Sequence, residues 1–173
     1  MTDKATFDKI FCYASPINRN KFYDPLVEAM EKKDIITPLR IAAFCASIIH
    51  ESGSFRYVRE IASGKAYEGR KNLGNIYPGD GVKFKGRGLI QITGRSNYAL
   101  CGKALAVDLL EHPILLESTL FATQSAVWFW NLHGLNGYAD KDDFRRITKI
   151  INGGYNGWED RFSNYNRIKK LLL

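Results

Sequence analysis

The chain has 173 residues, of which 45% are hydrophobic and 13% aromatic, so it can build a sizeable core and is not a disordered protein. Its 25 Lys and Arg residues outnumber 18 Asp and Glu residues, which gives a net charge of +7. A basic balance favours a polyanionic partner, such as nucleic acid, an anionic membrane or a bacterial wall, but does not choose among them. We expect a single domain, large enough to be a catalytic domain, over residues 1–173.

The three cysteines are Cys12, Cys45 and Cys101, an odd number without a Cys-x-x-Cys pair. This pattern supports neither a disulfide framework nor a zinc ribbon. The first eight residues lack the apolar core of a signal peptide, and the apolar stretch 41–49 is too short to span a bilayer. We expect synthesis in the cytoplasm without a signal peptide, and no cofactor.

Hydrophobic periodicity predicts a mostly helical chain. Thr37 and Pro38 form a helix start, and the residues from Leu39 to His50 are almost all apolar or small, which is typical of a central, buried helix. Gly53 should end that helix. Further helices are predicted over residues 5–13, 20–33, 64–72, 95–104, 118–132, 142–151 and 158–171.

Residues 74–88 are rich in glycine and are predicted to form a loop. Residues 83–85 and 89–93 are predicted to be two short strands around Gly86-Arg87-Gly88. The expected fold class is therefore α+β, mostly α-helical, with a small β-hairpin beside the central helix.

Glu51 stands at the end of the apolar helix, where the helix dipole disfavours a negative charge. Hydrolysis of a glycosidic bond needs a carboxylic acid in an apolar setting and a second group that delivers water, and Glu51 suits the first role. Glu60 follows nine residues later and converges with Glu51 only because Gly53 breaks the helix. The plain alternatives are a solvent-facing Glu51 and a surface Glu60.

Three further segments carry polar groups that suit a site. Gln91 and Thr93 share one face of the second predicted strand, where they line a cleft or simply face solvent. Asn152 precedes two glycines, which end a helix or admit a ligand close to the backbone. The aromatic run 128–130 packs in the core or stacks on sugars. A zinc site at His50 is excluded because Ser54 stands where the motif needs a second histidine.

Taken together, residues 38–168 resemble glycoside hydrolase family 19, especially its phage endolysin branch. The motifs that carry the resemblance are, in chain order, His50-Glu51-Ser52-Gly53, Tyr67-Glu68-Gly69-Arg70, Pro78-Gly79-Asp80-Gly81, Gly86-Arg87-Gly88-Leu89-Ile90-Gln91-Ile92-Thr93-Gly94, Asn97-Tyr98, Trp128-Phe129-Trp130 and Ile151-Asn152-Gly153-Gly154.

The resemblance implies a lysozyme-like fold and an inverting mechanism. Glu51 would be the general acid, Glu60 the base that activates water, and Thr93 would help to position that water. Substrate binding or orientation of the carboxylates would fall to His50, Tyr67, Gln91, Asn97, Asn152 and Arg161, with Tyr165 following Arg161. The short loop between Glu60 and Tyr67 departs from the family pattern and makes Glu60 the weaker assignment.

The chain lacks the paired cysteines and longer sugar-binding loops of plant chitinases, which favours peptidoglycan over chitin. The sequence therefore predicts a phage-type endolysin, a muramidase that lyses the host cell. Three alternatives stay open: a chitinase of the same family, a lytic transglycosylase that uses Glu51 alone, and a non-catalytic basic wall-binding or nucleic-acid-binding domain.

Residues 165–173 form a basic end with three leucines. They either pack on the core, which we expect, or make a weak contact with anionic membrane or lipopolysaccharide. No nucleic-acid motif is recognisable, so we expect peptidoglycan glycan strands as the partner and a monomer in solution.

Overall fold

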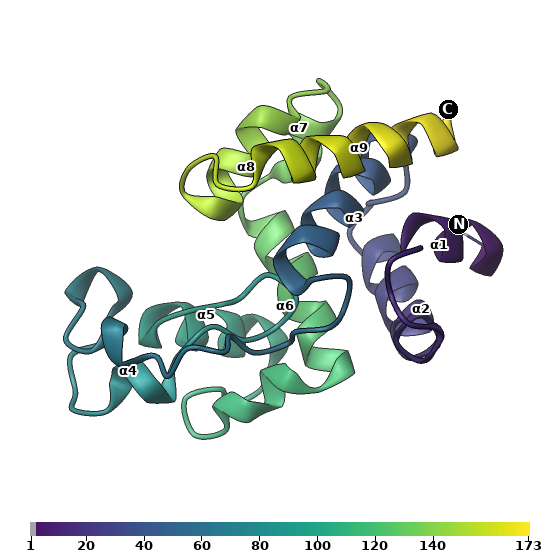
Figure 1. Ribbon diagram of the computed structural model, residues 1–173. Helices are drawn as coiled ribbons and strands as arrows, with labels where there is room; N and C mark the ends of the chain where they lie inside the picture. The colour runs from purple at the N-terminus through teal and green to yellow at the C-terminus, as the bar shows by residue number, and fades with distance from the viewer. Residues whose placement is uncertain (1–2) are drawn as a thin grey trace.

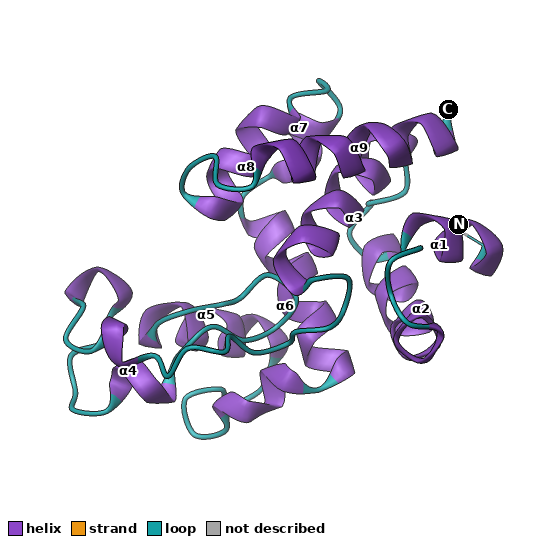
Figure 2. Ribbon diagram, in the orientation of Figure 1, coloured by secondary structure: helices purple, strands orange, loops and turns teal. Residues whose placement is uncertain are grey.

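The computed structural model describes residues 3–173 and confirms the mostly helical prediction (Figure 2). The α-helices are α1 Lys4–Ile10, α2 Pro16–Glu31, α3 Pro38–Ser52, α4 Asp80–Lys83, α5 Arg95–Leu105, α6 Thr119–Leu132, α7 Leu135–Ala139, α8 Phe144–Asn152 and α9 Trp158–Leu172. Three 3₁₀ helices are η1 Lys65–Tyr67, η2 Lys71–Leu73 and η3 Pro113–Glu117.

Helix α3 begins and ends where its sequence indicates. The Thr37 hydroxyl accepts a hydrogen bond from the Arg40 amide, and Pro38 opens the first turn. Gly53 adopts a left-handed conformation, with φ of 56°, and ends the helix. All residues from Ile41 to Ile49 are buried, so α3 is the centre of the main core.

The main core forms where α9 lies across α3, with α7 and α8 beside them (Figure 1). Trp130 of α6 is fully buried, and its ring meets the edge of Phe44 at 5.2 Å between centroids. The indole N–H of Trp130 donates to Asn136 at 2.8 Å. The aromatic run of α6 is therefore core packing at Trp130, while Trp128 and Phe129 are half-buried.

A second cluster supports the loops after α3. It contains Phe84, Ile92, Tyr98, Cys101, Leu109 and Leu116. Figure 1 shows α4, α5 and residues 53–94 on one side of α6, with α7, α8 and α9 on the other. Helix α3 ends at Ser52, so the chain enters these loops directly after the last turn of α3, which carries Glu51.

The predicted β-hairpin is reduced to two isolated antiparallel bridges, in which Arg87 pairs with Arg59 and with Ile92. Residues 3–173 contain no strand, because positive φ angles of 83° at Gly88 and 56° at Gln91 turn the backbone too tightly for a ladder. The prediction of strands over 83–85 and 89–93 was wrong, and Gln91 and Thr93 do not share a strand face.

The predicted helix over 64–72 is also replaced, by η1 and η2 with a left-handed Gly69 between them. None of the helices in the described part of the chain is long and apolar enough to cross a membrane. Cys45 and Cys101 are buried free thiols, and Cys12 is an exposed one.

The C-terminal helix is tied to the rest of the chain. Arg167 donates to the carbonyl oxygens of Lys9 and Ile10 at 2.9 and 2.7 Å. Lys169 forms an ion pair with Asp142, and Ile168 is fully buried. These contacts favour the packing interpretation of residues 165–173.

Candidate active site

Glu51 lies on the last turn of α3 and forms an ion pair with Arg161 from the first turn of α9. The Glu51 side chain is 17% exposed and that of Arg161 only 2%. The Arg161 Nε donates to the Asn156 carbonyl at 3.1 Å, while its Nη1 is buried without a partner. Arg161 therefore fixes one oxygen of Glu51 and keeps an unused donor beside it.

His50 is held by the same end of α9. Its Nδ1 lies 2.6 Å from the Asp160 carboxylate, which leaves the opposite edge of the ring free of hydrogen bonds. A Cβ on Gly157 would lie 2.2 Å from His50 Cε1, and Gly157 has a φ of 70°, so this position requires glycine. Asp160 and Gly157 are positioning residues that sequence reasoning did not single out.

Glu60 is half-buried in the loop after α3. Its Oε2 accepts a hydrogen bond from the Tyr67 hydroxyl at 2.9 Å, and its Oε1 is buried without a partner. Burial, and then the hydrogen bond to Glu60, raise the pKa of Tyr67, so that this hydroxyl stays a donor. The short loop does not turn Glu60 away into solvent.

A pocket of about 360 Å³ lies beside Glu60. It is lined by Arg56, Tyr57, Val58, Arg59, Glu60, Ile61, Lys85 and Glu117. The Lys85 ammonium donates to the backbone oxygens of Glu60 and Ala62 at 3.3 and 3.0 Å, which fixes this loop.

Gly86 brings the predicted base, amide and hydroxyl residues together. Its carbonyl accepts the Glu60 amide at 3.0 Å. A Cβ on Gly86 would lie 2.9 Å from Gln91 Oε1 and 3.3 Å from Thr93 Oγ1, so both side chains lie close against this glycine. Thr93 donates to the Gln91 carbonyl at 2.9 Å, and Asn97 donates to the Thr93 carbonyl at 2.8 Å.

The remaining predicted residues differ in their surroundings. Asn152 ends α8, Gly153 is its left-handed C-cap, and the Asn152 amide nitrogen is buried without a partner. Tyr165 stacks on Phe144 at 4.3 Å and its hydroxyl bonds Asp142, so it belongs to the core rather than to the carboxylates.

Unpartnered polar atoms concentrate on the predicted site residues. Seven buried side-chain nitrogen or oxygen atoms in residues 3–173 lack a hydrogen-bond partner, and four of them belong to Glu60, Gln91, Asn152 and Arg161. Buried polar atoms in folded proteins are almost always paired, so these four are expected to meet a ligand or water. Within residues 3–173, no hydrogen bond or ion pair joins Glu51 and Arg161 directly to Glu60 and Tyr67.

The other recognised motifs hold the loops around the site. Glu68 accepts the amides of Gly79 and Gly81 at 2.6 and 2.8 Å, which ties two motifs together. Asp80 is buried and paired with Arg95 at 2.6 Å. The Arg95 hydrogen bond keeps the pKa of Asp80 below its usual value. Across residues 3–173, no group of three or more His, Cys, Asp or Glu side chains could hold a metal ion.

Comparison with known proteins places this architecture in a family. The family model of class I chitinases matches residues 40–142. A Haemophilus influenzae protein described as containing a glycosyl hydrolase family 19 domain is 30% identical over 199 residues, covering 97% of this chain and 96% of that protein. The Arabidopsis thaliana endochitinase At2g43620 is 41% identical over 124 residues, but the match covers 70% of this chain and only 42% of the plant protein.

Solved structures give the same result for the fold. A bacterial family 19 chitinase superposes with a TM-score of 0.80 at 25% identity, covering 99% of this chain and 94% of that one. A class IV chitinase from Zea mays gives a TM-score of 0.77 at 25% identity, covering 98% and 92%. The lysozyme-like, mostly helical fold implied by the motifs is confirmed, and the chain belongs to glycoside hydrolase family 19.

Proposed function

We propose that the protein hydrolyses β-1,4 bonds in glycans that contain N-acetylglucosamine, with inversion at the anomeric carbon. The observation that carries the proposal is the pair of carboxylates on separate elements, each held by one partner: Glu51 by Arg161 and Glu60 by Tyr67. One oxygen of Glu60 stays free of protein partners, as a base that receives a proton requires.

The reaction is a single displacement, in which Glu51 donates its proton to the glycosidic oxygen as the bond from that oxygen to C1 breaks. The leaving sugar departs as an alcohol, and Glu51 becomes a carboxylate. Arg161 already contacts this side chain, so it stabilises the negative charge that appears on Glu51. Acid catalysis of this kind contributes about 10²–10⁴-fold to the rate.

In the same step, water attacks C1 from the opposite face and passes a proton to Oε1 of Glu60. The Tyr67 hydroxyl donates to Oε2 and keeps the carboxylate oriented. The Thr93 hydroxyl, which donates to the Gln91 carbonyl, has lone pairs left to accept a hydrogen bond from that water. The unpartnered oxygen of Gln91 and nitrogen of Asn152 suit the acetamido and hydroxyl groups of the sugar.

The substrate supported best by the comparisons is chitin, because the plant relatives and the solved structural neighbours are chitinases. A phage-type endolysin that acts on peptidoglycan is the second candidate. The net charge of +7 favours it, since peptidoglycan carries carboxylates and chitin does not. In that role the enzyme would be made in the host cytoplasm and would reach the wall after release.

Product analysis on both substrates tests the proposal. We expect soluble chitin hexamer to yield products that are initially the α-anomer, read by proton NMR, and Glu51→Gln to lower the rate by at least about 10²-fold. Release of muropeptides from purified peptidoglycan, without cleavage of chitin hexamer, would favour the endolysin. Products with a 1,6-anhydro end would show a transglycosylase, and wall binding without cleavage of either substrate would show a non-catalytic domain.

A further inference from the structure

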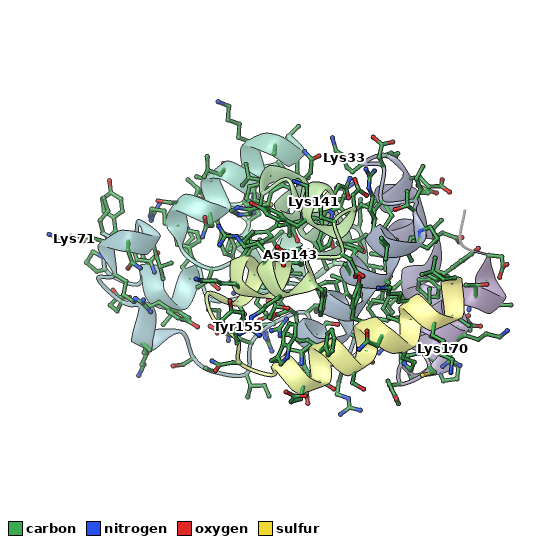
Figure 3. All side chains as sticks on the ribbon, turned by 90° about the horizontal axis from the view of Figure 1, so that it is seen from above. Lys33, Lys71, Lys141, Asp143, Tyr155 and Lys170 are labelled. Carbon is green, nitrogen blue, oxygen red and sulfur yellow. The ribbon has the colours of Figure 1, made fainter. Side chains whose placement is uncertain are left out.

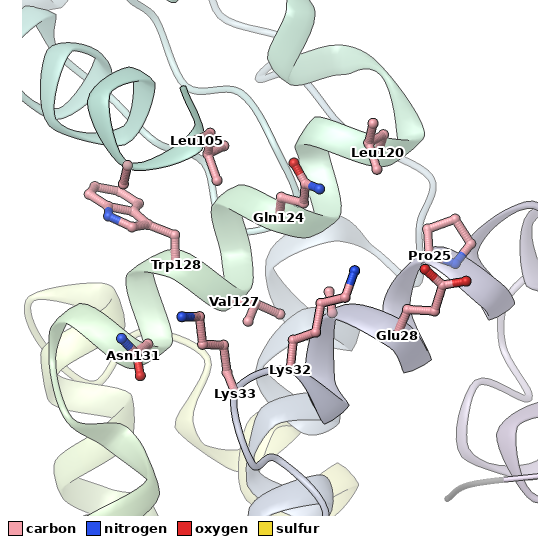
Figure 4. A pocket seen from close by; sticks show the side chains of 12 residues that line it. Pro25, Glu28, Lys32, Lys33, Leu105, Leu120, Gln124, Val127, Trp128 and Asn131 are labelled. Atoms are coloured by element: carbon pink, nitrogen blue, oxygen red, sulfur yellow. The ribbon is translucent and has the colours of Figure 1, made fainter. Parts of the chain in front are cut away.

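A second concave site lies between α2 and α6, away from the candidate active site (Figure 4). This α2–α6 groove has a volume of about 470 Å³. None of its lining residues belongs to the candidate active site. Its polar and aromatic lining residues are Glu28, Lys32, Lys33, Gln124, Trp128 and Asn131.

The floor of the groove is apolar and its rim is polar. Ala29 and Val127 form the floor, with 8% and 4% of their surface exposed. The half-buried indole of Trp128 forms a wall and packs against the second hydrophobic cluster on its other side. The short Ala29 side chain leaves the helices unfilled at this point, which makes a hollow rather than a packed seam.

The lysine, amide and indole groups on the rim make no hydrogen bond or ion pair with other described residues. Within residues 3–173, no hydrogen bond or ion pair involves the ammonium groups of Lys32 and Lys33, the amides of Gln124 and Asn131, or the indole N–H of Trp128. Figure 4 shows both ammonium groups pointing across the groove toward α6.

The charges in the groove are separated. Glu28 lies at the Pro25 end, whereas Lys33 lies at the end with Asn131 and Trp128 (Figure 4). The Lys33 end therefore combines the positive charge of Lys33, the donors of the Asn131 amide and the Trp128 indole N–H, and the aromatic wall formed by Trp128. An aromatic ring beside a few placed polar groups is typical of a small-ligand site.

We propose that the α2–α6 groove binds a sugar unit that carries a carboxylate or phosphate group. The ammonium groups of Lys32 and Lys33 attract the anion, the sugar ring lies against the Trp128 indole, and the two amides bond its hydroxyl or acetamido groups. The groove lies on the same chain as the candidate active site but on other helices. If the substrate of the proposed function is a polymer with acidic sugars, as peptidoglycan is, binding in the groove raises its local concentration at the site.

Binding is measured by the ¹⁵N indole resonances of the three tryptophans, with Trp128→Phe used to assign the Trp128 signal. The ligands are N-acetylmuramic acid, which carries a carboxylate, N-acetylglucosamine 6-phosphate, which carries a phosphate, and neutral N-acetylglucosamine. Sodium acetate and inorganic phosphate control for the anion alone. The Trp130 indole, which donates to Asn136, reports that the core is intact.

We expect at least one acidic sugar to shift the Trp128 signal at a concentration where N-acetylglucosamine, acetate and inorganic phosphate do not, and the acid that acts identifies the source of the anion. Lys32→Gln with Lys33→Gln should weaken that binding at least about fivefold. The matched control is Lys71→Gln with Lys170→Gln, which removes the same charge from two exposed lysines that Figure 3 shows well apart from Lys33. An equal shift with N-acetylglucosamine or a simple anion, no shift with any sugar, or equal weakening in both double variants would overturn the proposal. The readout does not depend on hydrolysis.

Discussion

Replacing Arg161 with methionine removes the one ion-pair partner that the described residues supply to Glu51. Methionine keeps most of the buried side-chain volume, so the main effect is that the Glu51 carboxylate loses its positively charged partner. Loss of one member of a buried pair costs about 3–5 kcal/mol, and the 17% exposure of Glu51 lets water recover part of that cost. We therefore expect a loss of about 3 kcal/mol, which lowers Tm by roughly 6–12 °C for a domain of this size.

Urea unfolding of four proteins measures this interaction: the wild type, Arg161→Met, Glu51→Gln and the double variant. The double variant should be about 1–2 kcal/mol more stable than Arg161→Met, because neither charge is then buried alone. Arg146→Met is the matched control, since the Arg146 side chain is exposed, and should stay within about 0.5 kcal/mol of wild type. The reasoning fails if Arg161→Met is as stable as that control, or if the two single changes add without interaction.

Four further changes test other parts of the structure. Glu60→Gln should lower the initial rate on a soluble oligosaccharide by about 10²–10⁴-fold. Tyr67→Phe should lower it by only about tenfold, because the Glu60 carboxylate is kept. A wild-type rate in Glu60→Gln would show that Glu60 is not the base. The folded-state pKa of Asp80 is lowered, so the ionised carboxylate contributes stability above the unfolded pKa of about 3.9, and this contribution is lost as the pH falls from there through the folded pKa. The stability advantage of wild type over Asp80→Asn should therefore shrink from pH 6 to pH 3. A constant difference across that range would contradict this reasoning. Deletion of residues 169–173 removes the ion pair with Asp142 and should lower the free energy of unfolding by about 1–2 kcal/mol. That deletion should leave the rate on isolated substrate at 20 °C unchanged, whereas a selective loss of lysis of intact cells at unchanged Tm would support the membrane contact instead.

The helices could be predicted because their signals are local. Thr37 and Pro38 start α3, Gly53 ends it, and the observed bounds agree with these residues. Helix α2 begins earlier than predicted, at Pro16, because Ser15 caps it by accepting the Asn18 amide. The prediction of a hairpin was wrong because the alternation of polar and apolar residues gives no information on backbone angles, and the positive φ at Gly88 and Gln91 prevents a strand.

The site could be predicted only in part, for a related reason. Glu51 and Gln91 stand in recognisable motifs, whereas Glu60 stands outside them, and the residues that position the site act across long separations. Asp160 reaches His50 over 110 positions in the chain, and no local pattern reports such a contact. The glycine at 157 gave a weak signal, since an Asn-Gly step before a helix is also an ordinary turn.

The placement of Glu51 is better explained by chemistry than by folding. A carboxylate on the last turn of a helix faces the negative end of the helix dipole, and burial adds a cost of desolvation. The fold offsets both costs with Arg161, itself buried and left with one unpartnered nitrogen. An apolar pair would stabilise the same contact between α3 and α9 at least as well. A carboxylate held there, with the chain turned at Gly53 so that Glu60 follows in the next loop, is the arrangement that the proposed mechanism uses.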